Sequence, residues 1–392
     1  MVFKNPYRNY GIVYALSLFM FEVFNPVLSQ IILNFDVPVS QVRLLVTIFL
    51  GAAMIAEFCM PIILIYLNIQ TVMRFMWWLG FFSSVVCFFA KTYEQIFMCR
   101  LLMGLSAGGL IILTRIAIEQ SEKNIVKGYH FAVGSMLGFH AMMAIVAPIM
   151  ASYVIFYFGW QSVQWLCVLG LLVMYPTLSQ WSQQLKCVQW QWKDYKQGLS
   201  FLYQQPKKIN AIILAGFIGS LPMCEVMFSS IYLTMHHHIP VWLLGLYLSG
   251  MKGVDACVRF KMPYVLNDYN APRLIKLGIV CLILSVGVLM VASSSNGLFA
   301  YLMGCMILNI TANALLIIFS VDVFVEVAKF APITGNAVFG SLQFGCSFLA
   351  AAILTLFLKM DLLGFVIYLC LFISCLIVLL LPRYRAHTLV IL

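Results

Sequence analysis

Long apolar segments recur along almost the whole chain, and they constrain its fold more than any other feature. A helix needs about 20 apolar residues to cross a bilayer, and in lipid it can satisfy all its backbone hydrogen bonds within one segment. The segments long enough to do so are residues 9–35, 41–67, 70–90, 95–118, 128–158, 160–181, 209–235, 241–265, 273–293, 297–321, 335–358 and 361–382. We therefore predict an all-α polytopic membrane protein with about 12 transmembrane helices.

Composition supports this interpretation and bears on the partners. The 392 residues are 63% hydrophobic and 9% charged, which is more apolar surface than one soluble core can bury. The net charge is +10, but the basic residues lie between the apolar segments and form no basic face. We therefore expect the lipid bilayer, and no nucleic acid, as a partner.

The longest polar segment lies between the sixth and seventh apolar segments. It predicts an N-terminal six-helix bundle at residues 1–181, a cytoplasmic linker at 182–208 and a C-terminal six-helix bundle at 209–392. The linker is rich in residues that suit a membrane surface, namely Lys186, Lys193, Lys196, Lys207, Lys208, Trp190 and Trp192. The alternative is an interfacial loop that only tethers the two halves.

The distribution of basic residues predicts the orientation. With both termini in the cytoplasm, most of the 23 Lys and Arg residues lie at cytoplasmic ends of spans, as the positive-inside rule requires. The exceptions are Arg43, Lys91 and Lys359 on the outer side, and Arg100 and Lys252 within spans. An even number of spans follows from this orientation.

No pattern indicates a metal, a cofactor or an enzymatic site. His236, His237 and His238 would point about 100° apart on a helix, which favours a solvated outer loop over a metal site. The cysteines lack the spacing of a disulfide framework and are expected as small core residues, among them Cys59, Cys87, Cys99, Cys167, Cys281, Cys305 and Cys375. Neither a nucleotide-binding P-loop nor a nucleophile motif is present.

Charged residues inside the apolar segments are the strongest functional signal, because each costs at least about 2.5 kcal/mol at a helix centre. Glu22 is followed by Asn25 and Pro26, and the proline should loosen the helix beside the acid. A carboxyl in this setting can load and release a proton. The alternative is an acid kept permanently neutral by a hydrogen bond. Glu57 in the second segment is a weaker candidate.

Arg100 begins the sequence RLLMGLSAGGL in the fourth segment, where Gly104 and Gly108 give a smooth helix face that permits close helix contact. Its guanidinium stays charged and therefore needs an anionic or a carbonyl partner. The alternative is an arginine that extends from the first turns of its span to the outer interface.

Three charged residues follow one another at helical spacing in the eighth segment. Lys252, Asp255 and Arg259 are three and four residues apart, which places them on one face and lets Asp255 pair with either neighbour. We therefore expect mutual neutralisation within one helix. Glu225 has no such partner in its own segment and follows Pro222, so it is the stronger candidate in the second half.

Several of these positions match a known family pattern. Glu22 and Pro26 match an acid followed four residues later by proline, with glutamate where aspartate is usual. Further matches are Arg100, Gly104, Ala107, Gly108 and Arg115, then Ala147, Pro148, Gly159 and Trp160, and in the eleventh segment Gly335, Ala337, Gly340, Gln343 and Phe344. In these motifs the chain resembles the major facilitator superfamily, and within it the Bcr/CflA-like drug:proton antiporters.

The resemblance implies a major facilitator fold, in which two six-helix bundles rock about a central cavity. It assigns proton and substrate exchange to Glu22 and the coupling of that proton to helix rearrangement to Arg100, and we add Glu225 as a second proton-coupling candidate. Helix packing and gating fall to small residues and prolines, namely Pro26, Gly104, Gly108, Pro148, Gly335 and Gly340.

The sequence between the second and third segments departs from the family pattern. It reads MPIILIYLNIQ, in which Pro61 is kept but Leu64 and Ile65 stand where the family has aspartate and arginine. That charge cluster normally holds one state by pairing between the bundles. Its loss should weaken one side of the alternating-access equilibrium.

Taken with the resemblance, these features predict a proton-coupled efflux antiporter of a bacterial inner membrane, which acts as a monomer on small amphipathic compounds or drugs. One alternative is an exporter of a specific metabolite, such as a siderophore or an amino-acid derivative, whose anionic group Arg100 binds. The other is a degenerate transporter that acts as a membrane sensor or scaffold, which the altered sequence after Pro61 motivates.

Overall fold

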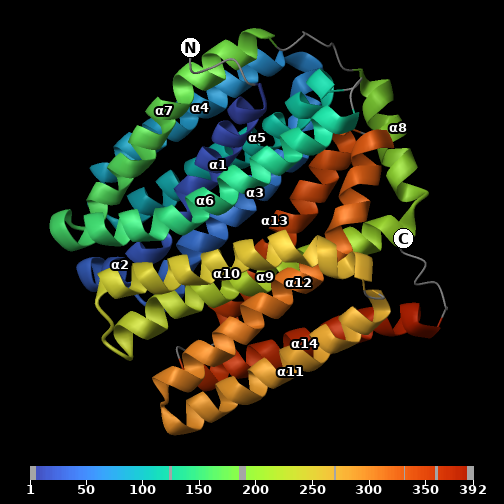
Figure 1. Cartoon of the computed structure of the whole chain (residues 1–392). Helices are drawn as coiled ribbons and strands as arrows, with labels where there is room; N and C mark the ends of the chain where they lie inside the picture. Colours follow the sequence, from blue (N-terminus) through green and yellow to red (C-terminus); the bar gives the residue numbers. More distant parts are fainter. Residues whose placement is uncertain are drawn as a thin grey trace.

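The chain folds into helices joined by short turns. The computed structural model describes residues 6–122, 126–184, 191–268, 271–330, 332–357 and 361–385, and these ranges contain no strand. The elements of the first half are α1 (Pro6–Glu22), η1 (Asn25–Val27), α2 (Leu28–Phe35), α3 (Val39–Tyr66), α4 (Ile69–Phe88), α5 (Tyr93–Glu122), α6 (Val126–Phe158), η2 (Trp160–Ser162) and α7 (Val163–Gln184). After α8 (Trp192–Tyr203) come α9 (Pro206–Met235), α10 (Val241–Asp268), α11 (Ala271–Ser295), α12 (Leu298–Phe330), α13 (Pro332–Phe357) and α14 (Leu362–Arg385) (Figure 1).

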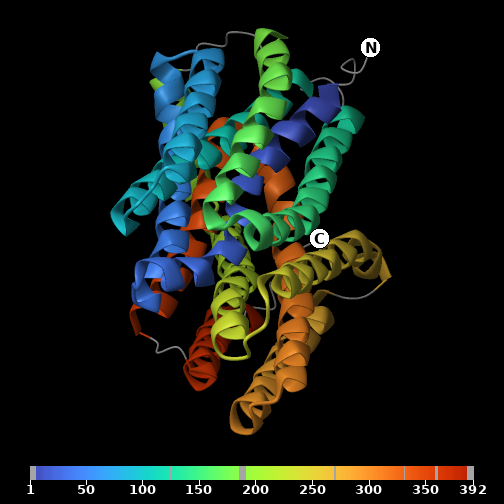
Figure 2. The ribbon, with the colours of Figure 1, turned by 90° about the vertical axis from the view of Figure 1, so that its left-hand side faces the viewer.

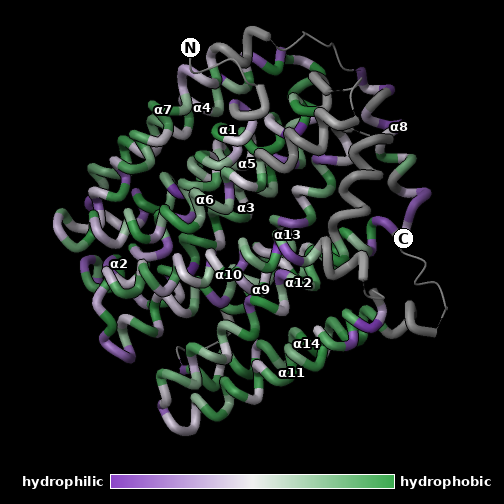
Figure 3. Tube along the Cα trace, in the orientation of Figure 1, coloured by the Kyte–Doolittle hydropathy of each residue, from purple (hydrophilic) through white to green (hydrophobic). Residues whose placement is uncertain are grey.

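The predicted all-α membrane class is confirmed. The described residues contain 12 helical spans long and apolar enough to cross a membrane, from Asn9–Phe35 to Leu362–Leu380, and each overlaps one of the predicted segments. Apolar residues cover most of α11 and α14 at the edge of the second half (Figure 3). Val280 and Leu371 are more than half exposed there. Such surface requires lipid as its solvent.

The first span is broken beside its acid. Glu22 ends α1, and the 3-10 turn η1 contains Pro26, which has no N–H to donate to a helix. The Phe24 N–H bonds to the carbonyl of Phe21 at 3.2 Å instead of to the Met20 carbonyl, its ordinary helical acceptor. The helix is therefore broken beside the acid, as predicted from Pro26, and the bond of the Phe24 N–H to Phe21 leaves the Met20 carbonyl available to another donor.

Small residues bring helices of the first half into backbone contact. A Cβ atom at Gly104 of α5 would overlap the carbonyl oxygen of Phe49 in α3, and one at Gly108 would lie 2.5 Å from the carbonyl oxygen of Ala53. Only glycine allows this approach, because any side chain would force the two helices apart. The packing role predicted for both glycines agrees with this geometry.

The two halves meet along two helix pairs. Gly51 of α3 faces the ring of Phe348 in α13, where a Cβ atom would lie 2.9 Å from the ring. Gly245 of α10 faces the carbonyl of Pro148 in α6, with a Cβ distance of 2.7 Å. The first half thus lies against the second through α3 with α13 and α6 with α10 (Figure 1, Figure 2).

Two details differ from the prediction. The linker at 182–208 contains the 12-residue helix α8 and the start of α9, so it is more ordered than a plain loop; Lys186 and Trp190 lie outside the described residues. All described cysteines are free, but Cys375 of α14 is exposed. The prediction of a core position is wrong for Cys375, because α14 lies at the edge of the second half (Figure 1).

Candidate site for substrate and protons

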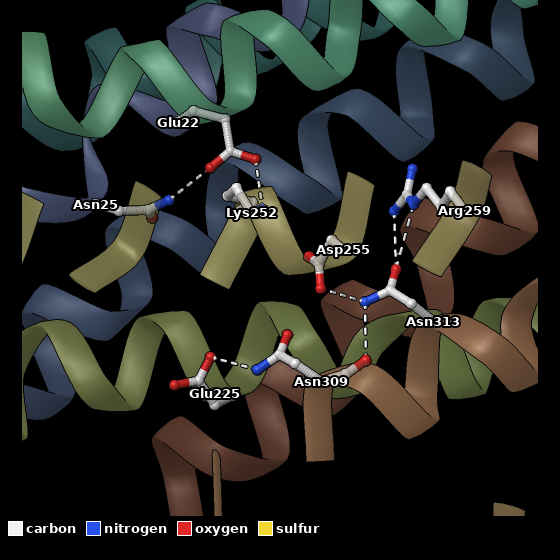
Figure 4. A network of polar contacts seen from close by, with 8 residues as sticks. All are labelled: Glu22, Asn25, Glu225, Lys252, Asp255, Arg259, Asn309 and Asn313. Atoms are coloured by element: carbon white, nitrogen blue, oxygen red, sulfur yellow. Dashed lines mark hydrogen bonds and ion pairs between the residues drawn. The ribbon is translucent and has the colours of Figure 1, made fainter. Parts of the chain in front are cut away.

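An ion pair joins the two halves near the middle of their spans. Lys252 Nζ of α10 lies 2.7 Å from Glu22 Oε1 of α1, and Asn25 Nδ2 donates to Glu22 Oε2 at 3.2 Å (Figure 4). The side chains of Lys252 and Glu22 are 13% and 5% exposed. Away from water, such a pair is stable only while both groups are charged. Loss of the carboxylate charge would therefore weaken a contact between the halves.

The predicted cluster of Lys252, Asp255 and Arg259 is organised differently from expectation. Asp255 Oδ1 accepts a hydrogen bond from Asn313 Nδ2 at 2.7 Å, and Arg259 Nε and Nη2 donate to Asn313 Oδ1 at 3.3 and 3.1 Å (Figure 4). The amide of Asn313 can bridge an acid and a base because it carries both a donor and an acceptor. Among the described residues these three side chains form no direct ion pair with one another, and each bonds to another helix, although Asp255 still interacts electrostatically with Lys252 and Arg259.

Glu225 is fully buried and is bonded by three helices. Its Oε1 accepts hydrogen bonds from Ser229 Oγ of α9 and, at 2.8 Å, from Tyr247 Oη of α10. Its Oε2 accepts from Asn309 Nδ2 of α12 at 3.0 Å. Tyr301 Oη of α12 lies 2.6 Å from Ser229 Oγ. Its own helix offers Glu225 no charged partner, as expected, but Ser229 one turn further along α9 supplies a hydroxyl.

Two asparagines connect Glu225 with the charged residues of α10. Asn313 Nδ2 donates to the backbone carbonyl of Asn309 at 3.0 Å, so polar groups run from Glu225 through α12 to Asp255 (Figure 4). The sequence analysis missed both asparagines. Their spacing of four within an apolar span was the available signal, because polar side chains inside a membrane bond across helices.

Arg100 reaches the helix break of the first span. It is fully buried, its Nη1 donates to the Met20 carbonyl at 3.1 Å, and its Cζ lies 4.0 and 4.3 Å from the ring centroids of Phe24 and Phe49. This is the carbonyl partner that the sequence analysis required. Full burial excludes the alternative of an arginine extending to the membrane surface. In the described part of the chain, Nε and Nη2 have no hydrogen-bond partner.

A second buried ion pair lies within the first half. Arg115 Nη1 of α5 is 3.5 Å from Glu57 Oε2 of α3, and Arg115 Nη2 donates to Tyr14 Oη of α1 at 3.3 Å. A Cβ atom at Gly340 of α13 would overlap the Glu57 carboxylate. The second half therefore packs directly on this pair. Gly335, earlier in α13, is also buried.

Arg43 is a further buried cation that the sequence analysis placed on the outer side. It is 1% exposed, and its Nη1 donates to the Leu354 carbonyl of α13 at 3.2 Å. One turn along α3, Thr47 Oγ1 lies 3.4 Å from Thr355 Oγ1. This face of α3 lies against α13, so Arg43 is buried between the two halves.

The histidine run forms the turn between α9 and α10. His236 and His238 are exposed and His237 is half-buried. Burial lowers the pKa of His237, as do the adjacent imidazoles of His236 and His238. In the ranges that the structure describes, no group of histidine, cysteine and acidic residues could hold a metal ion.

Comparison with known proteins agrees with this architecture. The Major Facilitator Superfamily model matches residues 10–355, and no curated protein matches the sequence. A mutant of the nucleoside transporter NupG has a TM-score of 0.67 at 16% identity, covering 97% of this chain and 99% of that chain. Another structure of NupG has a TM-score of 0.65 at 14% identity, covering 98% of this chain and 99% of that chain.

A bacterial homolog to the human lysosomal transporter Spinster, in an inward-facing and unoccupied conformation, has a TM-score of 0.66 at 13% identity, covering 97% of this chain and 96% of that chain. At these identities the solved structures show a shared fold. The family model spans most of the sequence, from the first helix to the end of α13. The chain therefore belongs to the major facilitator superfamily.

Proposed function

We propose that the protein is a proton-coupled secondary transporter that exports small amphipathic compounds across a bacterial inner membrane by alternating access, as the Bcr/CflA-like antiporters do. The buried Glu22–Lys252 ion pair between the halves carries this proposal. A proton on Glu22 removes the negative charge that Lys252 pairs with. Proton binding and separation of the halves are then linked, because each favours the other.

A second acid is placed to receive Lys252 when Glu22 is neutral. Asp255 lies three residues along the same helix, one turn away. Transfer of the ammonium from Glu22 to Asp255 would let the contact between the halves open without leaving an unpaired charge in the protein interior, which is the costly outcome.

Arg100 supports the proposed coupling through the shape of the first span. Its hydrogen bond to the Met20 carbonyl ends two residues before Glu22, at the turn where the helix is broken. Any rearrangement of this turn on protonation of Glu22 must keep or release that bond. Arg100 is therefore positioned to couple the protonation of Glu22 to the packing of α5.

The proposal includes the arrangement of the chain in the membrane. Residues 1–181 and 209–392 would move as two bundles joined by the segment 182–208, in a monomer with both termini in the cytoplasm. The excess of basic residues at that side supports the orientation. The Glu22–Lys252 contact then lies at the boundary where the two bundles separate.

A metabolite with an anionic group is the second candidate substrate. Arg259 is exposed although it lies inside the span Val241–Met262, and its guanidinium bonds to the neutral amide of Asn313. A carboxylate could therefore bind there with a charge-assisted hydrogen bond. Arg259 fits this role better than Arg100, because Arg100 is enclosed by Phe24 and Phe49.

Reconstitution in liposomes with an internal pH dye tests the proposal. Cationic, zwitterionic, anionic and nucleoside compounds are added separately, and substrate-driven proton movement is recorded for the wild type and for Glu22→Gln. We expect at least one class to drive proton movement in the wild type and none to do so in Glu22→Gln. Glu94→Gln, which changes an exposed carboxyl, is the matched control and should behave as the wild type.

Two outcomes would contradict the proposal. Coupled transport that survives Glu22→Gln combined with Glu225→Gln would remove the acids from the mechanism. If no compound drives proton movement in the correctly folded wild type, and a stable partner copurifies with it, a membrane sensor or scaffold is favoured.

A further inference from the structure

Glu225 sits at the junction of two kinds of polar contact. On one side are hydroxyl groups, Ser229 Oγ and Tyr247 Oη, which meet its Oε1. On the other side is the amide of Asn309, which meets its Oε2. A hydroxyl can accept one proton and release another, whereas an amide N–H2 group donates hydrogen bonds without exchanging its proton readily. Only the hydroxyl side can therefore carry protons.

One of the two hydroxyls continues to a further group. Tyr301 Oη lies 2.6 Å from Ser229 Oγ, so Glu225, Ser229 and Tyr301 form an unbroken hydrogen-bonded row from α9 to the first turn of α12. Tyr247 Oη donates to Glu225 itself and also contacts the Cys305 thiol, which is buried in the same cluster. Of the two tyrosines, Tyr301 therefore lies on the row through Ser229, and Tyr247 lies beside it.

Packed aromatic rings, with no hydrogen bond among the described residues, lie between the end of the row at Tyr301 and the histidine turn. The ring of Tyr301 lies 4.9 Å from that of Tyr232, centroid to centroid, and Tyr232 lies 5.0 and 5.2 Å from His236 and His237. His237 Nε2 is buried and has no hydrogen-bond partner within the described ranges. It is an imidazole, the side chain best suited to exchange protons near neutral pH.

We infer that Ser229 and Tyr301 relay protons between Glu225 and the turn formed by His236, His237 and His238. An imidazolium of the turn that comes within reach of Tyr301 Oη as the outer ends of the helices move gives it a proton and is left neutral, to be reprotonated from outside. The phenol proton of Tyr301 passes to Ser229 Oγ, and Ser229 passes its own proton to Glu225 Oε1. Both hydroxyls are restored and Glu225 has gained one proton. In the proposed orientation this turn faces the outside, so the relay supplies the proton that enters as substrate leaves.

The other titratable groups around Glu225 lie within the same cluster. Tyr247 contacts the carboxylate and the fully buried Cys305 thiol, and Cys305 also contacts Glu225, Ser229 and Tyr301. Cys305 lies one turn after Tyr301 in α12, so it does not extend the row toward the histidine turn. Asp255 is reached only through the amides of Asn309 and Asn313. These amides fix the position of Glu225 and separate it from the Glu22–Lys252 pair. The inference rests on the proton coupling proposed above.

The test compares two tyrosine variants in the liposome assay. Tyr301→Phe interrupts the relay without removing a bond to Glu225, whereas Tyr247→Phe removes a bond to Glu225 and leaves the relay intact. We expect Tyr301→Phe to slow substrate-driven proton movement by roughly a hundredfold, the lower end of what a positioned proton-transfer group contributes. Tyr247→Phe should slow it much less. Substrate affinity without a proton gradient should be unchanged in Tyr301→Phe.

Two variants of Ser229 test the relay independently and show whether a loss of activity comes from misfolding. Ser229→Ala should reproduce the loss and Ser229→Thr, which keeps a hydroxyl, should restore proton movement. His237→Phe, which preserves an aromatic ring beside Tyr232, should weaken the dependence of the rate on external pH near neutrality, and His236→Phe combined with it should weaken it further.

The possible results separate the relay from the transport proposal. Wild-type rates in both Tyr301→Phe and Ser229→Ala, with coupled transport intact, would overturn the relay alone. Tyr247→Phe slowing transport as much as Tyr301→Phe would also overturn it, because the hydroxyls would then only stabilise the carboxylate. Absence of any proton movement in the wild type would instead refute the proposed coupling, and the relay with it.

Discussion

Two buried acid–base pairs of this protein differ in what they join. Glu22 and Lys252 connect α1 with α10, one helix from each half, at 2.7 Å. Glu57 and Arg115 connect α3 with α5 inside the first half at 3.5 Å, and Tyr14 adds a bond to Arg115. Both pairs are almost excluded from water. Burial alone therefore does not distinguish an exchangeable contact from a fixed one.

The surroundings of the two pairs indicate their roles. Lys252 has Asp255 one turn away as a second acid, so it can exchange partners. Arg115 is instead enclosed by three elements, and Gly340 of α13 lies directly on the Glu57 carboxylate. We interpret the first pair as the contact that breaks during transport and the second as the platform on which the opposite half closes.

Replacing the basic residue of each pair should give the largest difference in effect between the two pairs. Arg115→Met leaves Glu57 buried without its cation, which costs about 3–5 kcal/mol for a buried pair, so thermal unfolding in detergent should begin at a clearly lower temperature. Lys252→Met should lower this temperature less, because Asn25 still bonds to Glu22, but it should abolish coupled transport.

The double variant Glu57→Gln with Arg115→Met is the control for this contrast, because it removes both charges and should recover part of the lost stability. If Lys252→Met destabilises the protein as much as Arg115→Met does, the proposed difference between an exchangeable and a fixed pair is wrong.

An added methyl group at the platform should give the next largest effect. Gly340→Ala places a Cβ atom against Glu57 and 2.6 Å from Arg115 Nη1, and overpacking of this kind costs roughly 1–3 kcal/mol. Since α13 belongs to the opposite half, we expect transport to fall more steeply than stability, measured by liposome uptake and thermal unfolding of the same preparation.

Gly250→Ala is the matched control, because a Cβ atom at Gly250 would meet nothing within 4 Å. Full transport activity in Gly340→Ala would show that the halves do not need to approach at this point.

The spans and their order could be read from the sequence because membrane insertion imposes one physical requirement on each segment. The break at Pro26 and the close packing at Gly104 and Gly108 were also predictable, since proline and glycine act through local geometry. These features depend on residues near one another in the chain or on a single residue type.

The partners of the charged residues could not be read in the same way. Lys252 has Asp255 at helical spacing, which favours a local pair, yet it bonds to Glu22, 230 residues away in the sequence. Arg43 lies near the start of its span, yet its guanidinium bonds to the Leu354 carbonyl, 311 residues away in the sequence. In both cases the partner depends on which helix packs against α3 or α10. A single sequence does not show which helices pack together.

The smallest effect is expected at a neutral contact between the halves. Thr47→Val removes a hydroxyl whose oxygen is 3.4 Å from that of Thr355, and hydrogen bonds between membrane helices contribute on average about 0.6 kcal/mol. A double-mutant cycle with Thr355→Val, followed by thermal unfolding and by transport rate, measures this coupling. Transport should change little, since a weak neutral bond is easily broken in each cycle. A coupling as large as that between Glu22 and Lys252 would show that the halves are held by their whole shared surface instead of by the ion pair, and the protonation of Glu22 would then be too small a change to separate them.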